Sequence, residues 1–168
     1  MDVGWMLPHA AFEWIKQNIP SGSRILEFGA GKGTLERAQH YDVTAVEHNE
    51  AYTSRDLNYL LTPIIWNEIS SQNNEQGWYD VKALLHLKKE EFALIIIDGP
   101  PGEVGRSGIL AHPWLLNLAP LIMVDDTHRE AERQLAHSIS GMMKNADIFV
   151  INEESEWGRR ETTVLGWK

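Results

Sequence analysis

A glycine-rich segment near the N-terminus constrains this chain more than any other feature. Residues 24–34 read R-I-L-E-F-G-A-G-K-G-T, so an apolar stretch runs into alternating glycines. The apolar part predicts a short buried strand from Arg24 to Phe28, and a helix is expected to begin near Thr34. Strand, glycine loop and helix in this order form the first half of a nucleotide-binding crossover, which places a ligand at a helix N-terminus.

The spacing of the glycines indicates the kind of ligand. A dinucleotide fingerprint, G-x-G-x-x-G, would need its third glycine at position 34, where Thr34 stands instead. Glu27 lies two residues before Gly29, at the carboxyl end of the predicted strand. A carboxylate there suits a ligand with an ammonium group and would repel a pyrophosphate. The motif therefore favours a ligand with an ammonium group over a dinucleotide.

A second carboxylate follows at a characteristic distance. Residues 42–48 predict a second strand, which ends in Glu47. An acid about twenty residues past the glycine loop is where such folds grip a pair of ribose hydroxyls. A solvated strand end is the alternative for Glu47.

With these two acids in place, the segment resembles the first motif of the class I S-adenosylmethionine (SAM) methyltransferases. The resemblance implies that Glu27 helps to hold the methionine end of SAM, that Glu47 takes both ribose hydroxyls, and that His48 lies near the adenine. It also implies that the cofactor is approached by the backbone of Gly29, Ala30, Gly31 and Gly33. The alternative is a glycine turn of structural use only.

The remaining segments predict alternating helices and strands. Helices are expected over residues 7–19, 49–61, about 109–118 and 127–143, with a further helix capped by Asp80 and a capping box at Thr127. Strands are expected over 63–66, 92–98 and 120–126, and a hairpin over 147–154 and 161–167. This is the layout of the methyltransferase fold: an α/β, Rossmann-like, seven-stranded sheet, mostly parallel with a C-terminal antiparallel hairpin and helices on both faces. We expect one domain over residues 1–168, with the helix within residues 1–20 packed on it.

Three carboxylates are expected at the carboxyl ends of neighbouring strands. Asp98 follows the most continuously aliphatic strand, and Asp125 and Asp126 end the next one. Ligands bind outside these ends, and three carboxylates suit a hard cation such as Mg²⁺ or Mn²⁺. Adjacent strand residues point to opposite faces, so Asp126 is expected to face the site and Asp125 is the weaker metal ligand. His128 is a candidate general base, with solvent exposure as the alternative.

Two later motifs carry a narrower resemblance. Residues 98–106 and 125–132 are similar to small O-methyltransferases of the polysaccharide-biosynthesis group, whose best-known members methylate glucuronic acid side chains of plant xylan. The matched residues are Asp98, Gly99, Pro100, Gly102, Arg106, Asp126, Arg129 and Glu132. Bacterial-type relatives share Trp78-Tyr79-Asp80, whereas His128 stands where the plant pattern has an acid.

The resemblance implies methyl transfer to a hydroxyl, with Asp98 and Asp126 among the matched residues; the candidate catalytic residues are these two together with His128, which the resemblance does not carry over. Trp78, Tyr79 and Arg106 are the candidate substrate-binding residues, and Arg106 suits an anionic substrate group. Packing and capping of the next helix is the alternative for Trp78 and Tyr79. Trp5 and Met6 are further candidates at the mouth of the cofactor site.

Charge and composition limit the kinds of molecule that the protein is expected to bind. The formal net charge of −9 disfavours DNA, RNA and anionic membranes. The chain contains no cysteine, which excludes disulfides, thiolate metal sites and cysteine nucleophiles. The N-terminus has no basic, apolar signal region and the apolar runs are strand-sized, so a cytoplasmic location is expected. A homodimer is left open.

The favoured function is SAM-dependent methyl transfer to a hydroxyl of a small molecule or sugar, with Mg²⁺ or Mn²⁺ assistance left open. One alternative is a metal-independent SAM methyltransferase acting on nitrogen or another small acceptor. Another is a module that binds SAM or a nucleotide without chemistry. The polar segment 67–77 is expected to be a long surface loop, either idle or acting as a lid.

Overall fold

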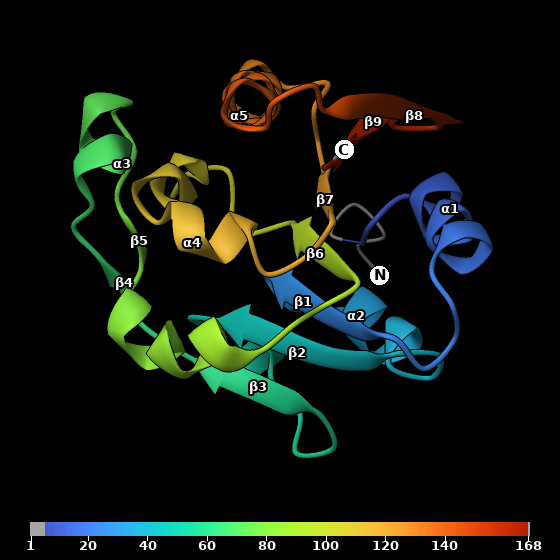
Figure 1. Cartoon of the computed structure of the whole chain (residues 1–168), viewed down its shortest axis with the longest axis horizontal. Coiled ribbons are helices and arrows are strands. Elements are labelled where there is room, and N and C mark those ends of the chain that lie inside the picture. The colour runs from blue at the N-terminus through green and yellow to red at the C-terminus, as the bar shows by residue number, and fades with distance from the viewer. Residues whose placement is uncertain (1–5, 168) are drawn as a thin grey trace.

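A seven-stranded sheet forms the centre of the molecule (Figure 1). The structure, a computed structural model, describes residues 6–167; Trp5 lies outside them. The strand order is β3-β2-β1-β6-β7-β9-β8. All strands run in one direction except β9, which is antiparallel to both β7 and β8. The strands are β1 (Arg24–Phe28), β2 (Asp42–Glu47), β3 (Asn58–Leu61), β6 (Leu94–Ile97), β7 (Leu121–Val124), β8 (Asp147–Ser155) and β9 (Gly158–Gly166).

Helices cover both faces of this sheet, as the sequence predicts. The α-helices are α1 (His9–Asn18), α2 (Lys32–Arg37), α3 (Glu68–Gln72), α4 (Pro113–Leu116) and α5 (Glu130–Met142). The 3₁₀ helices are η2 (Glu50–Tyr52), η3 (Val81–Lys89) and η4 (Ser107–Ala111). Within the described residues, no helix is long and apolar enough to cross a membrane.

Strand periodicity divides the core into two layers. Ile25 and Ile96 face α1, which contributes Ile15 to that layer. Their neighbours Leu26 and Ile97 point to the opposite face, where η3, η4, α4 and α5 pack. Side chains of a strand alternate between faces, so a strand covered on both sides must be apolar throughout, as Leu94–Ile97 is.

The order of the strands creates the place for a ligand. The chain runs from β1 outward to β3 and then crosses back to form β6 on the other side of β1. The connection that follows β1 therefore leads toward β2, whereas the connection that follows β6 leads toward β7 on the opposite side. Ligands of open α/β sheets bind in the crevice at such a switch point.

The carboxyl ends of β1 and β6 are in direct contact at the switch point. The backbone N–H of Asp98 donates to Phe28 O at 2.9 Å, which continues the register of β1 and β6. Gly29 has a φ of +91°, and a Cβ on it would lie 2.8 Å from Asp98 O. Only glycine tolerates both this backbone conformation and this approach. The first glycine of the motif is therefore required by the crossing of the two loops.

The third strand of the sheet differs from the sequence prediction. Residues 49–61, predicted to be helical, form η2 and then β3. Residues 63–66 form instead β4 (Ile64–Ile65), which pairs with β5 (Trp78–Tyr79) in a separate two-stranded sheet. Because β3 is an edge strand with no buried residue, it lacks the apolar alternation that identifies a strand.

Other element boundaries shift for local reasons. Helix α5 begins at Glu130, and the hydroxyl of Thr127 contacts Glu161 and Thr163 on β9 instead of capping the helix. The helix expected to run to residue 118 is split into η4 and α4, the latter beginning at Pro113. The polar segment 67–77 contains the short helix α3. The cap by Asp80, the first strand and the C-terminal hairpin are confirmed.

Candidate functional site

A cavity of about 1010 Å³ opens at the switch point. Its walls come from the loop after β1, the end of β2, the loop after β6 and the segment after β7, and Arg160 of β9 completes them. All of the predicted cofactor-binding residues line it: Glu27, Gly29, Ala30, Gly31, Gly33, Glu47 and His48. Met6 also lines the cavity.

Glu27 lies at the floor of this cavity and is almost fully buried, with 1% of its surface exposed. Its Oε1 accepts a short hydrogen bond from Arg37 Nη2, whereas its Oε2 has no hydrogen-bond partner among the described residues. Burial raises the pKa of Glu27, and the interactions with Arg37 and Thr34 oppose this shift. One carboxylate oxygen is therefore left for a ligand that donates hydrogen bonds.

Backbone amides hold Glu47 in place. Its Oε1 accepts from the N–H groups of His48 and Asn49, both at 2.8 Å, and its Oε2 accepts from Ala30 N at 2.8 Å. The last bond ties the end of β2 to the glycine loop. Since Oε2 accepts only this one bond, it keeps capacity for a hydroxyl donor. The ring Nδ1 of His48 lies 2.9 Å from Glu47 Oε1.

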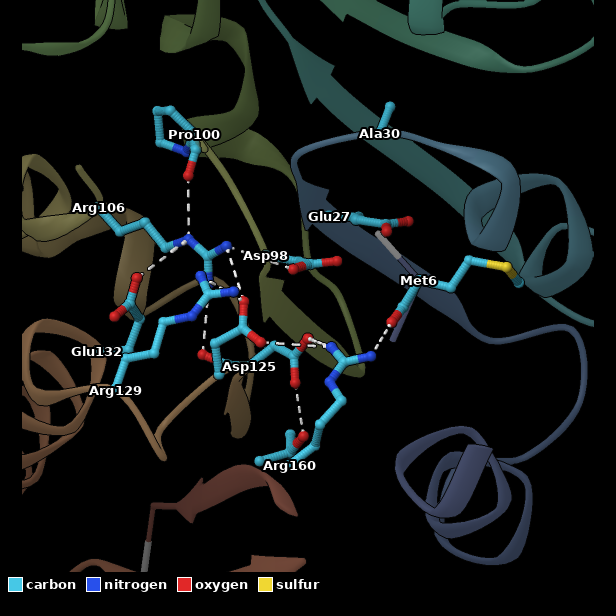
Figure 2. A network of polar contacts seen from close by, with 12 residues as sticks. Met6, Glu27, Ala30, Asp98, Pro100, Arg106, Asp125, Arg129, Glu132 and Arg160 are labelled. Atoms are coloured by element: carbon cyan, nitrogen blue, oxygen red, sulfur yellow. Dashed lines mark hydrogen bonds and ion pairs between the residues drawn. The ribbon is translucent and has the colours of Figure 1, made fainter. Parts of the chain in front are cut away.

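Arg106 connects the two aspartate-bearing strand ends (Figure 2). Its Nε donates to Pro100 O at 3.0 Å, and its Nη1 and Nη2 donate to Asp125 O and Asp126 Oδ2, both at 3.3 Å. The same guanidinium lies 3.5 Å from Asp98 Oδ1. Although Arg106 lines the cavity, these bonds engage its donors and leave it 6% exposed. The predicted substrate-binding residue instead organises the surrounding carboxylates.

The three predicted metal-ligating carboxylates come together. Asp98, Asp125 and Asp126 each offer an oxygen within 4.8 Å of the others. Arginines already occupy this cluster, because Arg160 Nη2 lies 3.0 Å from Asp125 Oδ2 and 3.3 Å from Asp126 Oδ1. Arg129 lies 3.1 Å from Asp126 Oδ2. A metal ion bound by all three carboxylates would have to displace these guanidinium groups, so the metal site stays a prediction.

Asp98 has the properties of a base at the cavity wall. Its side chain is 18% exposed and lines the cavity, next to Gly99. Burial, together with the negative charge of Asp125, raises the pKa of Asp98 well above its ordinary value. A carboxylate with a raised pKa accepts a proton more readily at neutral pH.

Asp125 and His128 lie away from the cavity walls. Asp125 is fully buried, and its Oδ1 accepts from Thr162 Oγ1 at 2.6 Å. His128 Nδ1 accepts from the backbone N–H of Glu161 at 3.3 Å. Asp126 has a φ of +60°, so the chain turns sharply after β7 and carries His128 toward β9. His128 is therefore not among the residues that line the cavity, and its role as general base stays a prediction, whereas Asp126 lines the cavity as predicted.

Trp78 and Tyr79 belong to the core rather than to the large cavity. The Trp78 ring is fully buried and packs 5.4 Å from the Phe28 ring. Tyr79 lines a separate cavity of about 230 Å³, and its hydroxyl lies under Gly99, where an added Cβ would meet it at 2.8 Å. Neither lines the large cavity at the switch point, so their predicted substrate contact is corrected to a packing role.

The cavity-lining residues that the sequence does not predict include Arg37, Tyr59 and Arg160. Arg37 had a local signal, since it lies one helical turn after Gly33, on the side of α2 that faces the glycine loop. Tyr59 belongs to β3, the edge strand that lies where the sequence predicts a helix. Arg160 follows Asp125 by 35 residues, so no local pattern links the two.

Several solved structures share this fold. An O-methyltransferase from Bacillus cereus, in complex with SAH, has a TM-score of 0.64 at 14% identity, covering 95% of this chain and 82% of its own. The O-methyltransferase TomG from Streptomyces achromogenes, in complex with SAM, has a TM-score of 0.55 at 15% identity, covering 89% and 75%.

A third neighbour is described with an RNA substrate. Sp1610 from Streptococcus pneumoniae, described as a candidate tRNA (m1A22) methyltransferase and bound to SAM, has a TM-score of 0.57 at 12% identity, covering 96% of this chain and 73% of its own. No family model matches the chain, and no curated protein sequence matches it. At these identities the likeness shows the fold, which is the Rossmann-like fold of SAM-dependent methyltransferases.

Proposed function

We propose that this chain is a SAM-dependent methyltransferase that methylates an oxygen of a small molecule or sugar. One observation carries the proposal: Glu27 and Glu47 face the same cavity from either side of the glycine loop, at the switch point of the sheet. Each has a carboxylate oxygen with accepting capacity left. An ammonium group at Glu27 and a ribose at Glu47 match the two ends of SAM.

The glycine loop fits such a cofactor. Gly29 and Gly99 pass each other so closely that a side chain on either would clash with the other loop. The loops therefore present their backbone to the cavity, which lets a ligand approach the main chain. When bound, SAM supplies an electrophilic methyl group.

Asp98 is the proposed general base. It follows β6, beside the glycine loop, and lines the same cavity as Glu27. With SAM bound, its carboxylate would accept the proton of the acceptor hydroxyl while the methyl group passes to that oxygen; the electron pair of the broken carbon–sulfur bond would stay on sulfur, leaving S-adenosylhomocysteine. The adjoining wall, formed by Gly102, Glu103 and Arg129, is polar and suits a hydroxylated acceptor.

We further propose that arginines, rather than a metal ion, neutralise the carboxylates. Arg106, Arg129 and Arg160 all lie within 3.5 Å of an oxygen of Asp98, Asp125 or Asp126. The narrower resemblance to sugar O-methyltransferases supports the oxygen acceptor, because five of its matched residues gather in this cluster: Asp98, Arg106, Asp126, Arg129 and Glu132. The net charge of −9 supports an uncharged or small acceptor over a nucleic acid.

Calorimetry and a transfer assay test the function together. SAM and S-adenosylhomocysteine are expected to bind the purified chain in the micromolar range, whereas NAD is not. An acceptor panel of sugars and phenols is then screened for the mass gain of one methyl group. Tight binding of NAD without binding of SAM would refute the proposal, and SAM binding without transfer to any acceptor would favour a binding module.

A further inference from the structure

Among residues 6–167, Arg37 is the one buried cation that the proposed chemistry does not yet use. It ends α2, is 3% exposed, and lines the cavity beside Glu27. Its Nη2 donates to Glu27 Oε1, and that is the only hydrogen bond the side chain makes within the described residues. Its Nε is buried without a partner. A guanidinium has five N–H donors, so most of the hydrogen-bonding capacity of Arg37 is unused.

The guanidinium lies against the last glycine of the loop. A Cβ added to Gly33 would lie 3.0 Å from Arg37 Nη1 and 3.5 Å from its Nη2. A side chain at position 33 would therefore push the guanidinium away from the loop. The absence of a side chain there lets Arg37 reach across to Glu27 from the following helical turn.

Arg37 and Glu27 together present opposite charges at one point of the cavity floor. Each partner leaves a polar atom without a hydrogen bond: Nε in Arg37 and Oε2 in Glu27. Unsatisfied buried donors and acceptors are costly, and the cost is larger for charged groups. A ligand that relieves both must offer an acceptor to Arg37 Nε and a donor to Glu27 Oε2, and the carboxylate and ammonium groups of an α-amino acid offer both with complementary charges.

We infer that Arg37 binds the carboxylate of the amino-acid end of the cofactor, while Glu27 binds its ammonium group. The two side chains then form a clamp for an α-amino acid zwitterion. This inference rests on the proposed function and extends it, because it names the residue that distinguishes a carboxylate-bearing cofactor from its decarboxylated form. Arg37 is thus a specificity-determining binding residue.

The test compares three ligands by isothermal titration calorimetry. SAM carries both charged groups, decarboxylated SAM keeps only the ammonium group, and 5′-methylthioadenosine has neither. The wild-type chain is expected to bind SAM at least about tenfold more tightly than decarboxylated SAM, since a charge-assisted hydrogen bond is lost. Equal wild-type affinity for these two ligands would overturn the clamp without any variant.

Arg37→Gln then identifies the residue responsible. We expect it to weaken SAM binding by roughly 10- to 100-fold and to change the affinity for decarboxylated SAM by less than about threefold. If Arg37 served only to hold Glu27, both ammonium-bearing ligands would weaken equally, and that result would refute a direct contact. Arg159→Gln is the matched control, because Arg159 is a 58% exposed cation that is not among the residues lining the cavity, and it should leave all affinities nearly unchanged.

Failure of this inference differs from failure of the proposed function. If the wild-type chain binds neither SAM nor 5′-methylthioadenosine, the cofactor assignment itself is wrong and the clamp falls with it. If the wild-type chain binds SAM but the variant loses affinity for all three ligands alike, only the role of Arg37 is wrong. Thermal unfolding of the variant with and without SAM establishes that it is folded under the conditions of titration.

Discussion

At the scale of single residues, the site is a set of buried charges whose partners determine what each can do. Glu27, Glu47 and Asp98 all line one cavity, yet their surroundings differ. Glu47 accepts three backbone hydrogen bonds, Glu27 pairs with an arginine, and Asp98 shares its arginine with other carboxylates. Of the three, the pKa of Asp98 is raised well above its ordinary value, because burial and Asp125 disfavour its ionised form.

Asp98→Asn tests the proposed base. The amide preserves the shape of the side chain but cannot accept the acceptor's proton, so kcat should fall by roughly 10²- to 10⁴-fold. Because the cofactor is held by other residues, the dissociation constant of SAM should change by less than about threefold. Steady-state kinetics and calorimetry measure the two quantities, and a variant with undiminished kcat would remove Asp98 from catalysis.

Chelation tests the role of arginine in the carboxylate cluster. Because guanidinium groups already engage Asp125 and Asp126, pre-incubation with EDTA should leave the initial rate of methyl transfer unchanged. The rate is measured before and after addition of excess Mg²⁺ or Mn²⁺. Loss of activity on chelation, with recovery on adding either ion, would show that a metal displaces the arginines.

At the scale of elements, the crossing of two loops determines the shape of the site. The loop after β1 and the loop after β6 approach so closely that Gly29 and Gly99 face each other without side chains. The backbone of both loops thereby forms the floor under the cavity. Arg106 joins the loop after β6 to the end of β7, because its guanidinium donates hydrogen bonds to Pro100 O and to Asp125 O.

Gly29→Ala should destabilise the protein and impair SAM binding. The new Cβ would lie 2.8 Å from Asp98 O, and the φ of +91° is itself unfavourable for alanine. Gly22→Ala is the matched control, because Gly22 has a φ of +83° but its Cβ would meet no atom within 4 Å. We expect a loss of roughly 1–3 kcal/mol for Gly22→Ala and a clearly larger one for Gly29→Ala. Urea unfolding gives both values; equal losses would mean that the loop crossing adds nothing.

At the scale of the whole molecule, the C-terminal hairpin completes the site. Arg160 of β9 donates to Met6 O at 2.7 Å and pairs with Asp125 at the end of β7. It thereby joins the segment before α1, the centre of the sheet and the hairpin (Figure 2). Three parts of the chain that are far apart in sequence are held together by one guanidinium.

Arg160→Met should therefore unfold at lower denaturant concentration than the wild type. Removing the cation leaves the buried Asp125 carboxylate with Thr162 as its remaining side-chain partner, a change that typically costs about 3–5 kcal/mol. Arg159→Met is the control, since Arg159 is 58% exposed and its loss should change stability by less than about 0.5 kcal/mol. Comparable losses in the two variants would contradict the assigned role of Arg160.

The pH dependence of stability follows from the same buried acids. The pKa values of Asp98 and Asp125 are raised in the folded state, mainly by burial, so the native protein holds these protons more tightly than the unfolded chain. Their contribution is full below the unfolded value and is lost as pH rises through the folded pKa. Above about pH 4, Asp98→Asn should flatten the decline of unfolding free energy with pH. A slope identical to that of the wild type would show that Asp98 does not titrate in this range.

Local patterns in the sequence determined much of the fold and half of the site. The strand from Arg24 to Phe28, the glycine loop, and the acids at 27, 47 and 98 were all predictable, because each depends on residues adjacent in the chain. A buried parallel strand must be apolar, and its carboxyl end must lie at the ligand edge of the sheet. The antiparallel hairpin was predictable because its alternation of apolar and polar residues is also a local pattern.

Tertiary structure alone decided which side chains meet at the ends of those strands. The direction of His128 depends on the turn at Asp126, and the burial of Trp78 depends on Phe28 from a distant strand. Arg160 reaches Asp125 only because β9 returns antiparallel beside β7. Strand periodicity tells a residue's face, but its partners are set by which elements pack there, and that packing is a property of the whole chain.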